Sequence, residues 1–233
     1  LYYYCTNHSN MGGQANTNST FGSTNFEGGI KCTLSANPTA GFSIATYDGN
    51  NTIGHGLGKI PQLIICKPLR SYNWIVYYNV VDGSSDYMVL NTTAAGATGG
   101  GTYTSSVASA QVNGSCVQYH FVSIPGYSKM GIYRGNGSAD GPLVNCGFKP
   151  AWLMIKRTTG AGDWALRDNK RDPANVSNTA LYANYNIAEG STSLTFDILS
   201  NGFKLRSNHV EAVSYTHLRA HETREAGGWR GGG

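Results

Sequence analysis

The sequence predicts an all-β protein made of two tandem antiparallel domains, and three observations support that prediction. Only 13 % of the 233 residues are charged, whereas 31 are Gly and 15 are Tyr. Short apolar or alternating runs are separated by turns rich in Gly, Asn and Ser, and no segment keeps a helical period for three turns. Two phrases of the chain also recur. Together these features favour two β-sandwich or jelly-roll-like repeats.

The recurrence is the clearest sign of domain organisation. The phrase GFSIATYDGN at residues 41–50 returns, with one inserted residue, as GYSKMGIYRGN at 126–136. PQLIICK at 61–67 returns as PAWLMIK at 150–156, and Trp74 corresponds to Trp164. The offset grows slowly along the chain, as loop insertions would make it, and its size suits one small β domain.

The expected elements follow the apolar runs in chain order. Residues 1–40 are predicted to be the end of a preceding segment followed by a Gly- and Asn-rich linker. The first repeat is expected over 41–125 and the second over 126–212. Strands are expected at 42–46, 63–66, 74–78, 87–89 and 117–123, then at 152–155, 164–166 and 203–205. An alternative, in which both copies jointly form one larger sandwich, remains open.

The C-terminal segment breaks this pattern. VSYTHLRAHET at 213–223 resembles, residue for residue, one reading frame of a transposase-type sequencing-library adapter, so 213–233 is interpreted as an adapter-derived artefact. His217 and His221 have the spacing of a helical Zn²⁺ pair, but they belong to this artefact. The strand at 117–123 has its expected counterpart at 210–216, where the tail begins. The second repeat is therefore predicted to be truncated, with an exposed sheet edge.

Composition excludes several classes of function. The formal charge of +4 comes without a basic cluster, which argues against nucleic-acid binding. No apolar run approaches the length of a membrane span. The five cysteines have no CxxC spacing and are predicted to be buried free thiols. Residue 1 is Leu and no signal segment follows it, so the chain is expected to be a fragment of a longer protein.

No residue pattern predicts catalysis, and the protein is therefore expected not to be an enzyme and to bind no cofactor or metal. The Gly-rich segment 54–59 leads into a strand, which favours a turn over a phosphate-binding loop. Asp163, Asp168 and Asp172 lack EF-hand spacing and are interpreted as loop carboxylates rather than ligands of Ca²⁺ or glycosidase acids.

Aromatic side chains are the best candidates for recognition. A ring with a polar tip suits both sugar stacking and protein interfaces. We select five such residues as possible receptor or glycan contacts: Tyr72, Trp74, Tyr103, Trp164 and Tyr185.

Three phrases carry a family resemblance. IGHGLGKIP at 53–61, GFKPAWLMIKR at 147–157 and NGFKLRS at 201–207 together resemble a domain of unknown function of the DUF7483 type, over residues 30–211. That domain is found in phage tail-fibre-like virion proteins. The resemblance implies a non-enzymatic tail or fibre component that is assembled in the host cytoplasm, forms homo-oligomers, contacts other tail proteins and binds a host-surface glycan or protein. A bacterial secreted carbohydrate-binding module or adhesin is the alternative, and a fibre-borne glycan depolymerase is a third.

Overall fold

The computed structural model describes residues 22–80, 82–109 and 114–209, together with the backbone of β1 (Tyr2–Tyr4), β2 (Gly12–Gln14) and β20 (Tyr215–His221). Within these residues every regular element is a β-strand, and every strand pairing is antiparallel. The described residues hold no helix that could cross a membrane. The all-β, antiparallel prediction is confirmed.

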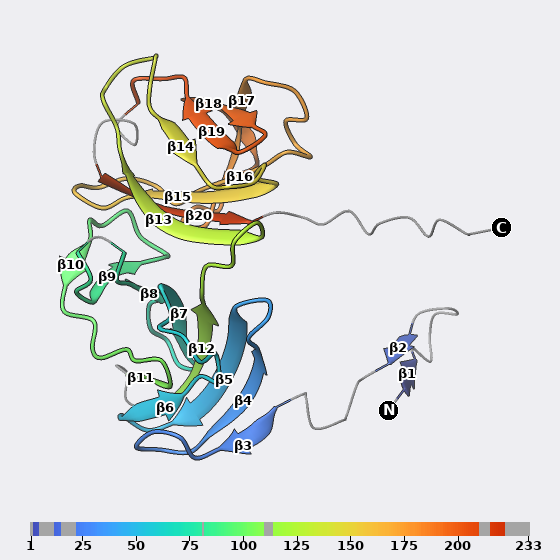
Figure 1. Ribbon diagram of the computed structural model, residues 1–233, viewed down its shortest axis with the longest axis vertical. Coiled ribbons are helices and arrows are strands. Elements are labelled where there is room, and N and C mark those ends of the chain that lie inside the picture. The colour runs from blue at the N-terminus through green and yellow to red at the C-terminus, as the bar shows by residue number, and fades with distance from the viewer. Residues whose placement is uncertain are drawn as a thin grey trace.

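The first unit is an eight-stranded sheet in the order β10-β9-β8-β7-β12-β5-β4-β3 (Figure 1). Its strands are β3 (Ser23–Asn25), β4 (Cys32–Asn37), β5 (Phe42–Asp48), β7 (Leu63–Pro68), β8 (Ile75–Tyr78), β9 (Asp86–Val89), β10 (Ala97–Thr98) and β12 (Ser115–Phe121). A two-stranded ribbon of β6 (Thr52–Gly54) and β11 (Val107–Ser109) packs on its inner face, where Ile53 and Ala108 enter the apolar core.

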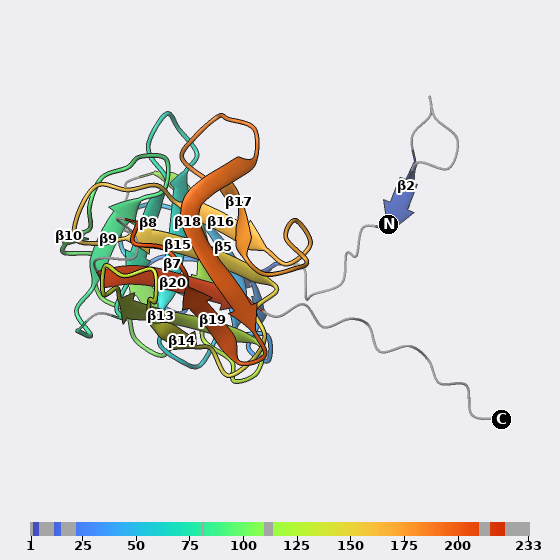
Figure 2. The same ribbon diagram turned by 90° about the horizontal axis from the view of Figure 1, so that it is seen from above.

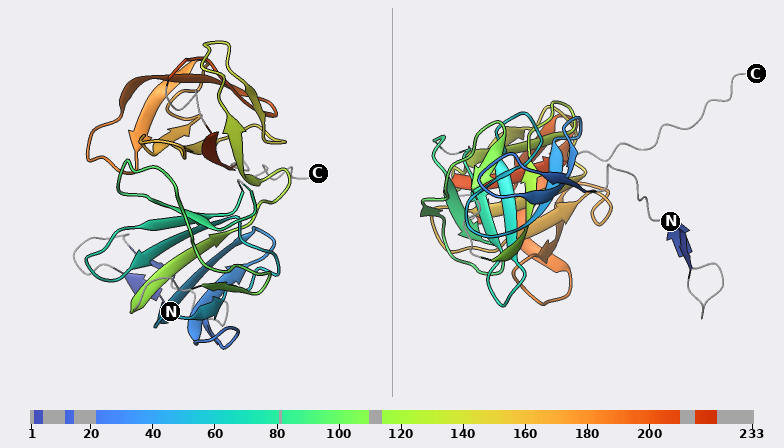
Figure 3. Two further views of the ribbon diagram at one scale, coloured as in Figure 1. Left: turned by 90° about the vertical axis from the view of Figure 1, so that its left-hand side faces the viewer. Right: turned by 90° about the horizontal axis from the view of Figure 1, so that it is seen from below.

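The second unit is also eight-stranded, in the order β13-β20-β15-β16-β17-β18-β19-β14. Besides β20 its strands are β13 (Ser128–Arg134), β14 (Leu143–Asn145), β15 (Trp152–Arg157), β16 (Ala165–Asp168), β17 (Ser177–Tyr182), β18 (Gly190–Leu199) and β19 (Gly202–Leu205). This sheet curls until its two ends touch (Figure 3), since Tyr133 of β13 packs edge-on against Phe203 of β19 with ring centroids 5.9 Å apart.

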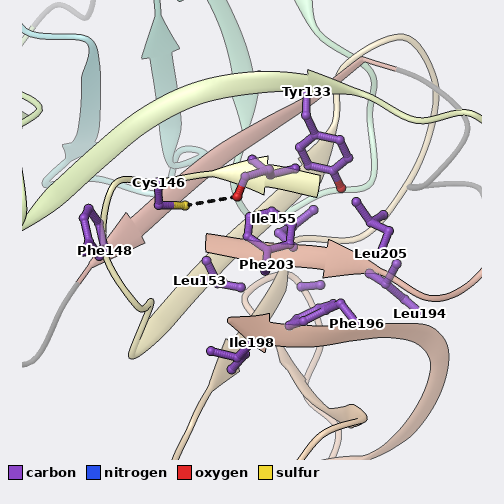
Figure 4. Close-up of a cluster of buried hydrophobic side chains, with 12 residues drawn as sticks. Tyr133, Cys146, Phe148, Leu153, Ile155, Leu194, Phe196, Ile198, Phe203 and Leu205 are labelled. Carbon is purple, nitrogen blue, oxygen red and sulfur yellow. Dashed lines mark hydrogen bonds between the residues drawn. The ribbon is translucent and has the colours of Figure 1, made fainter. Parts of the chain in front are cut away.

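The core of the second unit lies inside this curl (Figure 4). Alternate residues of β15, Leu153 and Ile155, point into it and meet Phe196 from β18. The Cys146 thiol donates a weak hydrogen bond to the carbonyl oxygen of Val144. Cys146 and three cysteines of the first unit are buried and form no disulfide, as predicted, whereas Cys5 lies outside the described residues.

The sequence repeat is also a structural repeat. The strand order β5-β12-β7-β8-β9 of the first sheet recurs as β13-β20-β15-β16-β17 in the second. The main-chain N–H of Trp74 donates to Asn91 Oδ1 at 3.0 Å, and that of Trp164 donates to Asn184 Oδ1 at 2.8 Å. Both tryptophans are therefore anchored by the same side-chain contact. A jelly-roll type of connection remains a prediction.

The outer faces of the two sheets pack against each other. A third apolar cluster takes Leu63, Val76 and Met88 from the first unit and Met154 and Trp164 from the second. Seen from above, the second unit lies over the first (Figure 2). Each unit thus keeps its own core on its inner face, and the two share a further core between them.

Two predicted boundaries were wrong. The second unit is not open, because β20 pairs with β13 on one side and β15 on the other, in the place that β12 takes in the first unit. Strand pairing uses main-chain groups alone, so the residue types did not reveal this strand. The sequence offset between the two copies keeps growing along the chain, and the closing strand therefore lies at Tyr215–His221 and not at 210–216. His217 and His221 lie in this strand, not in a helix. The adapter origin of the tail remains a prediction.

The first unit also begins earlier than residue 41. β3 and β4, which fall in the predicted linker, pair with the rest of the sheet, and Cys32 and Leu34 of β4 are buried in its core. The strand signal was weak because alternate residues such as Thr24 and Thr33 are polar and face solvent.

Candidate functional site

The first unit contains a buried chain of polar side chains that resembles a catalytic set in composition only. Ser43 Oγ donates to His120 Nδ1 at 3.2 Å, and His120 Nε2 donates to Gln118 Oε1 at 3.0 Å. This tautomer follows because the Gln118 amide nitrogen donates to Tyr47 Oη and to the carbonyl of Ser109. No Ser/His pair was predicted, because only the pairing of β5 with β12 sets Ser43 opposite His120.

Burial keeps this chain of side chains from acting on a substrate. Ser43, Gln118 and His120 are all 0 % exposed. Desolvation lowers the pKa of His120 to about 3, and the nearby His55 contributes in the same direction. A neutral, enclosed imidazole with both nitrogens bonded is an interior hydrogen-bonding group.

The three candidate carboxylates organise turns. Asp163 accepts from the Asn184 amide at 2.9 Å, and Asp168 accepts from the main-chain N–H groups of the two residues 170 and 171. Asp172 accepts hydrogen bonds from hydroxyl and main-chain groups of residues 177–179. Within the described ranges no three His, Cys, Asp or Glu side chains gather as a metal site would require.

Of the five predicted contact residues, Trp164 is wrong as a surface contact. Its side chain is 0 % exposed and lies between the two units. Its indole N–H donates to the carbonyl of Val89 in the first unit at 3.0 Å. The residue is a structural part of the interface between units.

The other four occupy three different places. Tyr72, which is 55 % exposed, and the partly exposed Trp74 share the β7–β8 turn. Tyr103 is half-buried against the core of the first unit, and its hydroxyl donates to the carbonyl of Gly100. Tyr185 is 51 % exposed in the second unit and packs edge-on against Tyr182. Only the first pair forms a common surface.

That surface continues as a row of side chains across the outer face of the first sheet. Thr24 pairs with Thr33, Thr33 with Thr46, Thr46 with Val117, and Val117 with Lys67. Trp74, the residue immediately before β8, lies next to Lys67, because the last pair of the β7–β8 ladder is Cys66 with Ile75. Directly paired residues share one face of a sheet. We call the set Thr24, Thr33, Thr46, Val117, Lys67 and Trp74 the outer row.

The outer row is open to solvent. Its three threonines are exposed and its other members are partly exposed, whereas the alternate residues of the same strands, such as Cys32, Tyr47 and Cys116, are core. Among the described residues none of the three threonine hydroxyls has a protein partner. They are therefore available to hydrogen-bond a ligand.

A hollow of about 340 Å³ lies over this face. It is lined by residues of the outer row and of the neighbouring positions on the same strands: Thr24, Lys31, Cys32, Thr33, Thr46, Tyr47, Asp48, Leu69, Ser115 and Cys116. The site thus combines hydroxyl groups, an exposed Leu and a few charges. Sequence reasoning found Trp74 and Tyr72 from their type, but it missed the threonines because only strand register aligns them.

The turn that carries the aromatic residues is held in place. Lys67 Nζ donates to the carbonyl oxygens of Arg70 at 3.3 Å and Tyr72 at 2.8 Å, and it lies 5.8 Å from the Trp74 ring centroid. The guanidinium of Arg70 lies 5.6 Å from the Tyr72 ring. The main-chain N–H of Leu69 donates to the Ser115 carbonyl at 2.8 Å. A site fixed in this way costs little ordering entropy when it binds.

Comparison with known proteins gives a family but no activity. Residues 10–216 match the family described as Domain of unknown function (DUF7483), and since this covers most of the chain, the protein belongs to that family. The match spans both units together. No curated protein and no solved structure matches the chain.

Proposed function

We propose that this DUF7483 protein is a non-enzymatic component of a phage tail or tail fibre, and that it binds a host-surface glycan along the outer row of its first unit. In this proposal the protein is assembled in the host cytoplasm, resides in the virion as a homo-oligomer and contacts other tail proteins. The phage context rests on the sequence resemblance, and the glycan site rests on the geometry.

The observation that supports glycan binding is the combination of Trp74 with a line of exposed threonine hydroxyls, none of which has a partner among the described residues, on one face of the sheet. A sugar ring offers an apolar face that stacks on an aromatic ring and hydroxyls that exchange hydrogen bonds with others. Apart from this face, the chemically reactive groups described above are buried or bound within turns. A shallow face of this kind binds weakly, and several copies on one virion would supply avidity.

A glycan array probed with the oligomeric protein tests the proposal. We expect binding to surface polysaccharides, and we expect Trp74→Ala to weaken it about tenfold, as the loss of one stacking contact would. Thr33→Val, which removes a hydroxyl at nearly constant volume, should weaken it less. Tyr185→Ala is the matched control, because it removes an exposed aromatic ring from the other unit.

Four results would count against this assignment. Absence of binding to every glycan removes the recognition role. Loss of binding in Tyr185→Ala but not in Trp74→Ala moves the site to the second unit. Release of reducing ends from a bound polysaccharide would favour the depolymerase alternative. Absence of the protein from purified virions would favour the secreted module or adhesin.

A further inference from the structure

We propose that the ligand of the outer row is an anionic linear glycan that lies across the strands, with its acidic groups held at the two cationic ends of the row. This inference rests on the proposed function and adds a ligand class and a direction of binding.

The direction follows from the arrangement of the strands. The outer row places one side chain on each of five neighbouring strands, β3, β4, β5, β12 and β7, and a sixth, Trp74, at the residue that precedes β8. Strands in a sheet are about 4.8 Å apart, so the row is about 24 Å long. The strand spacing is close to the length of one pyranose in an extended chain. Successive sugars can therefore meet Thr24, Thr33 and Thr46 in turn and end at Trp74.

The ligand class follows from the charges beside the row. Lys31 lines the hollow near the Thr24 end, and Lys67 and Arg70 stand at the Trp74 end. Asp48 is the carboxylate in the lining of the hollow, at the position where β5 pairs with Ser115. The hollow itself is lined by one cation and one carboxylate, and Lys67 and Arg70 add two cations at the Trp74 end. This added positive charge favours a ligand that carries negative charge.

The fixed position of the Lys67 ammonium group also selects where an acidic group of the ligand can bind. Two of its ammonium protons go to the carbonyl oxygens of Arg70 and Tyr72, which fixes the group beside the Trp74 ring. An ammonium has three donors, so one remains for a ligand. A sugar stacked on Trp74 would place a carboxylate, sulfate or phosphate substituent within reach of it. The acidic group can thus belong to a uronate, a sulfated or a phosphorylated polymer.

Matched oligosaccharides test the proposal with the oligomeric protein. Oligogalacturonates are compared with their methyl esters, carrageenan oligosaccharides with agarose oligosaccharides, and a polysaccharide that bears phosphate monoesters with its phosphatase-treated form. We expect at least one acidic member to bind about tenfold more tightly than its neutral match, with affinity falling as salt rises. Affinity should also rise with chain length up to about five sugars, the number that the row accommodates.

Charge variants complete the test. Lys31→Gln and Arg70→Gln should each reduce the preference for the acidic member, and Lys170→Gln in the second unit should leave it unchanged. Equal binding of acidic and neutral members, or no gain beyond a disaccharide, overturns this inference while a Trp74-dependent neutral glycan would still support the proposed function. Absence of binding to all of them overturns both.

Discussion

The Lys67–Trp74 pair of the first unit and the Lys156–Trp164 pair of the second are equivalent in sequence and local structure, yet their surroundings differ. In each pair the Lys is the next-to-last residue of one strand, and the Trp immediately precedes the next strand. Lys67 Nζ donates to the carbonyl of Tyr72 at 2.8 Å, and Lys156 Nζ donates to that of Gly162 at 2.9 Å. The local turn is therefore built in the same way twice.

The difference lies in what covers each pair. The end of β9 and the segment after it lie over the second pair. Thr93 O accepts from Lys156 Nζ at 3.1 Å, and Val89 O accepts from the Trp164 indole at 3.0 Å. Lys156 and Trp164 are 0 % exposed as a result. Lys67 and Trp74 remain partly exposed. The same local motif is thus part of the buried interface between the units in the second unit, whereas in the first unit it is partly exposed to solvent.

The strongest test of this comparison is truncation of the two tryptophans. Trp164→Ala should reduce the free energy of unfolding by about 3–5 kcal/mol, because it leaves a cavity in the shared core and removes the hydrogen bond from the indole to the Val89 carbonyl. Trp74→Ala should cost about 1 kcal/mol or less, since Trp74 is only partly buried. Urea denaturation of both variants gives the two values. Equal losses would show that the units do not pack as described.

Low pH should destabilise the first unit in particular, because His120 is buried in its interior. Its pKa is about 3 in the folded state against 6.5 in the unfolded chain, so unfolding takes up a proton as pH falls below 6.5. Stability should therefore decline towards pH 3, by up to about 1.4 kcal/mol per pH unit. His120→Gln should flatten this decline in denaturation curves collected across the range. An unchanged slope would assign the acid sensitivity to other groups.

Alkaline pH should reveal the burial of Lys156. Burial lowers the pKa of Lys156 from 10.5 to about 8, so the unfolded chain holds the proton more tightly. The contribution of this group to stability should rise between pH 8 and 10.5, by up to about 1.4 kcal/mol per pH unit. Lys156→Met should remove that rise relative to the parent protein. Lys67→Met serves as the control, and a similar change in both variants would contradict the comparison.

The smallest expected effect concerns the outer-row threonines. Thr33→Val and Thr46→Val should change the free energy of unfolding by less than about 0.5 kcal/mol, because Val has high β-propensity and the hydroxyls have no described protein partner. The same variants should weaken glycan binding. A clear loss of stability in thermal unfolding would mean that these hydroxyls serve the fold and not a ligand.

The sequence by itself determined the β class, the tandem repeat and the equivalence of the two tryptophan turns. These are local properties: alternation with period two, Gly- and Asn-rich turns, and a side chain such as Asn91 or Asn184 that caps the same backbone group. It also predicted the buried thiols, because cysteines within apolar runs favour the interior.

Only the tertiary structure decided that the second unit has a closing strand, that its Lys–Trp turn is covered by the first unit, and that the equivalent turn of the first unit is exposed. The closing strand Tyr215–His221 is placed by main-chain pairing between β13 and β15, and such pairing leaves little trace in residue type. Trp164 is buried because Val89 and Thr93, distant in sequence, pack over its turn. The outer row exists because register aligns threonines from separate strands. Burial and alignment depend on contacts between distant segments, which no local pattern encodes.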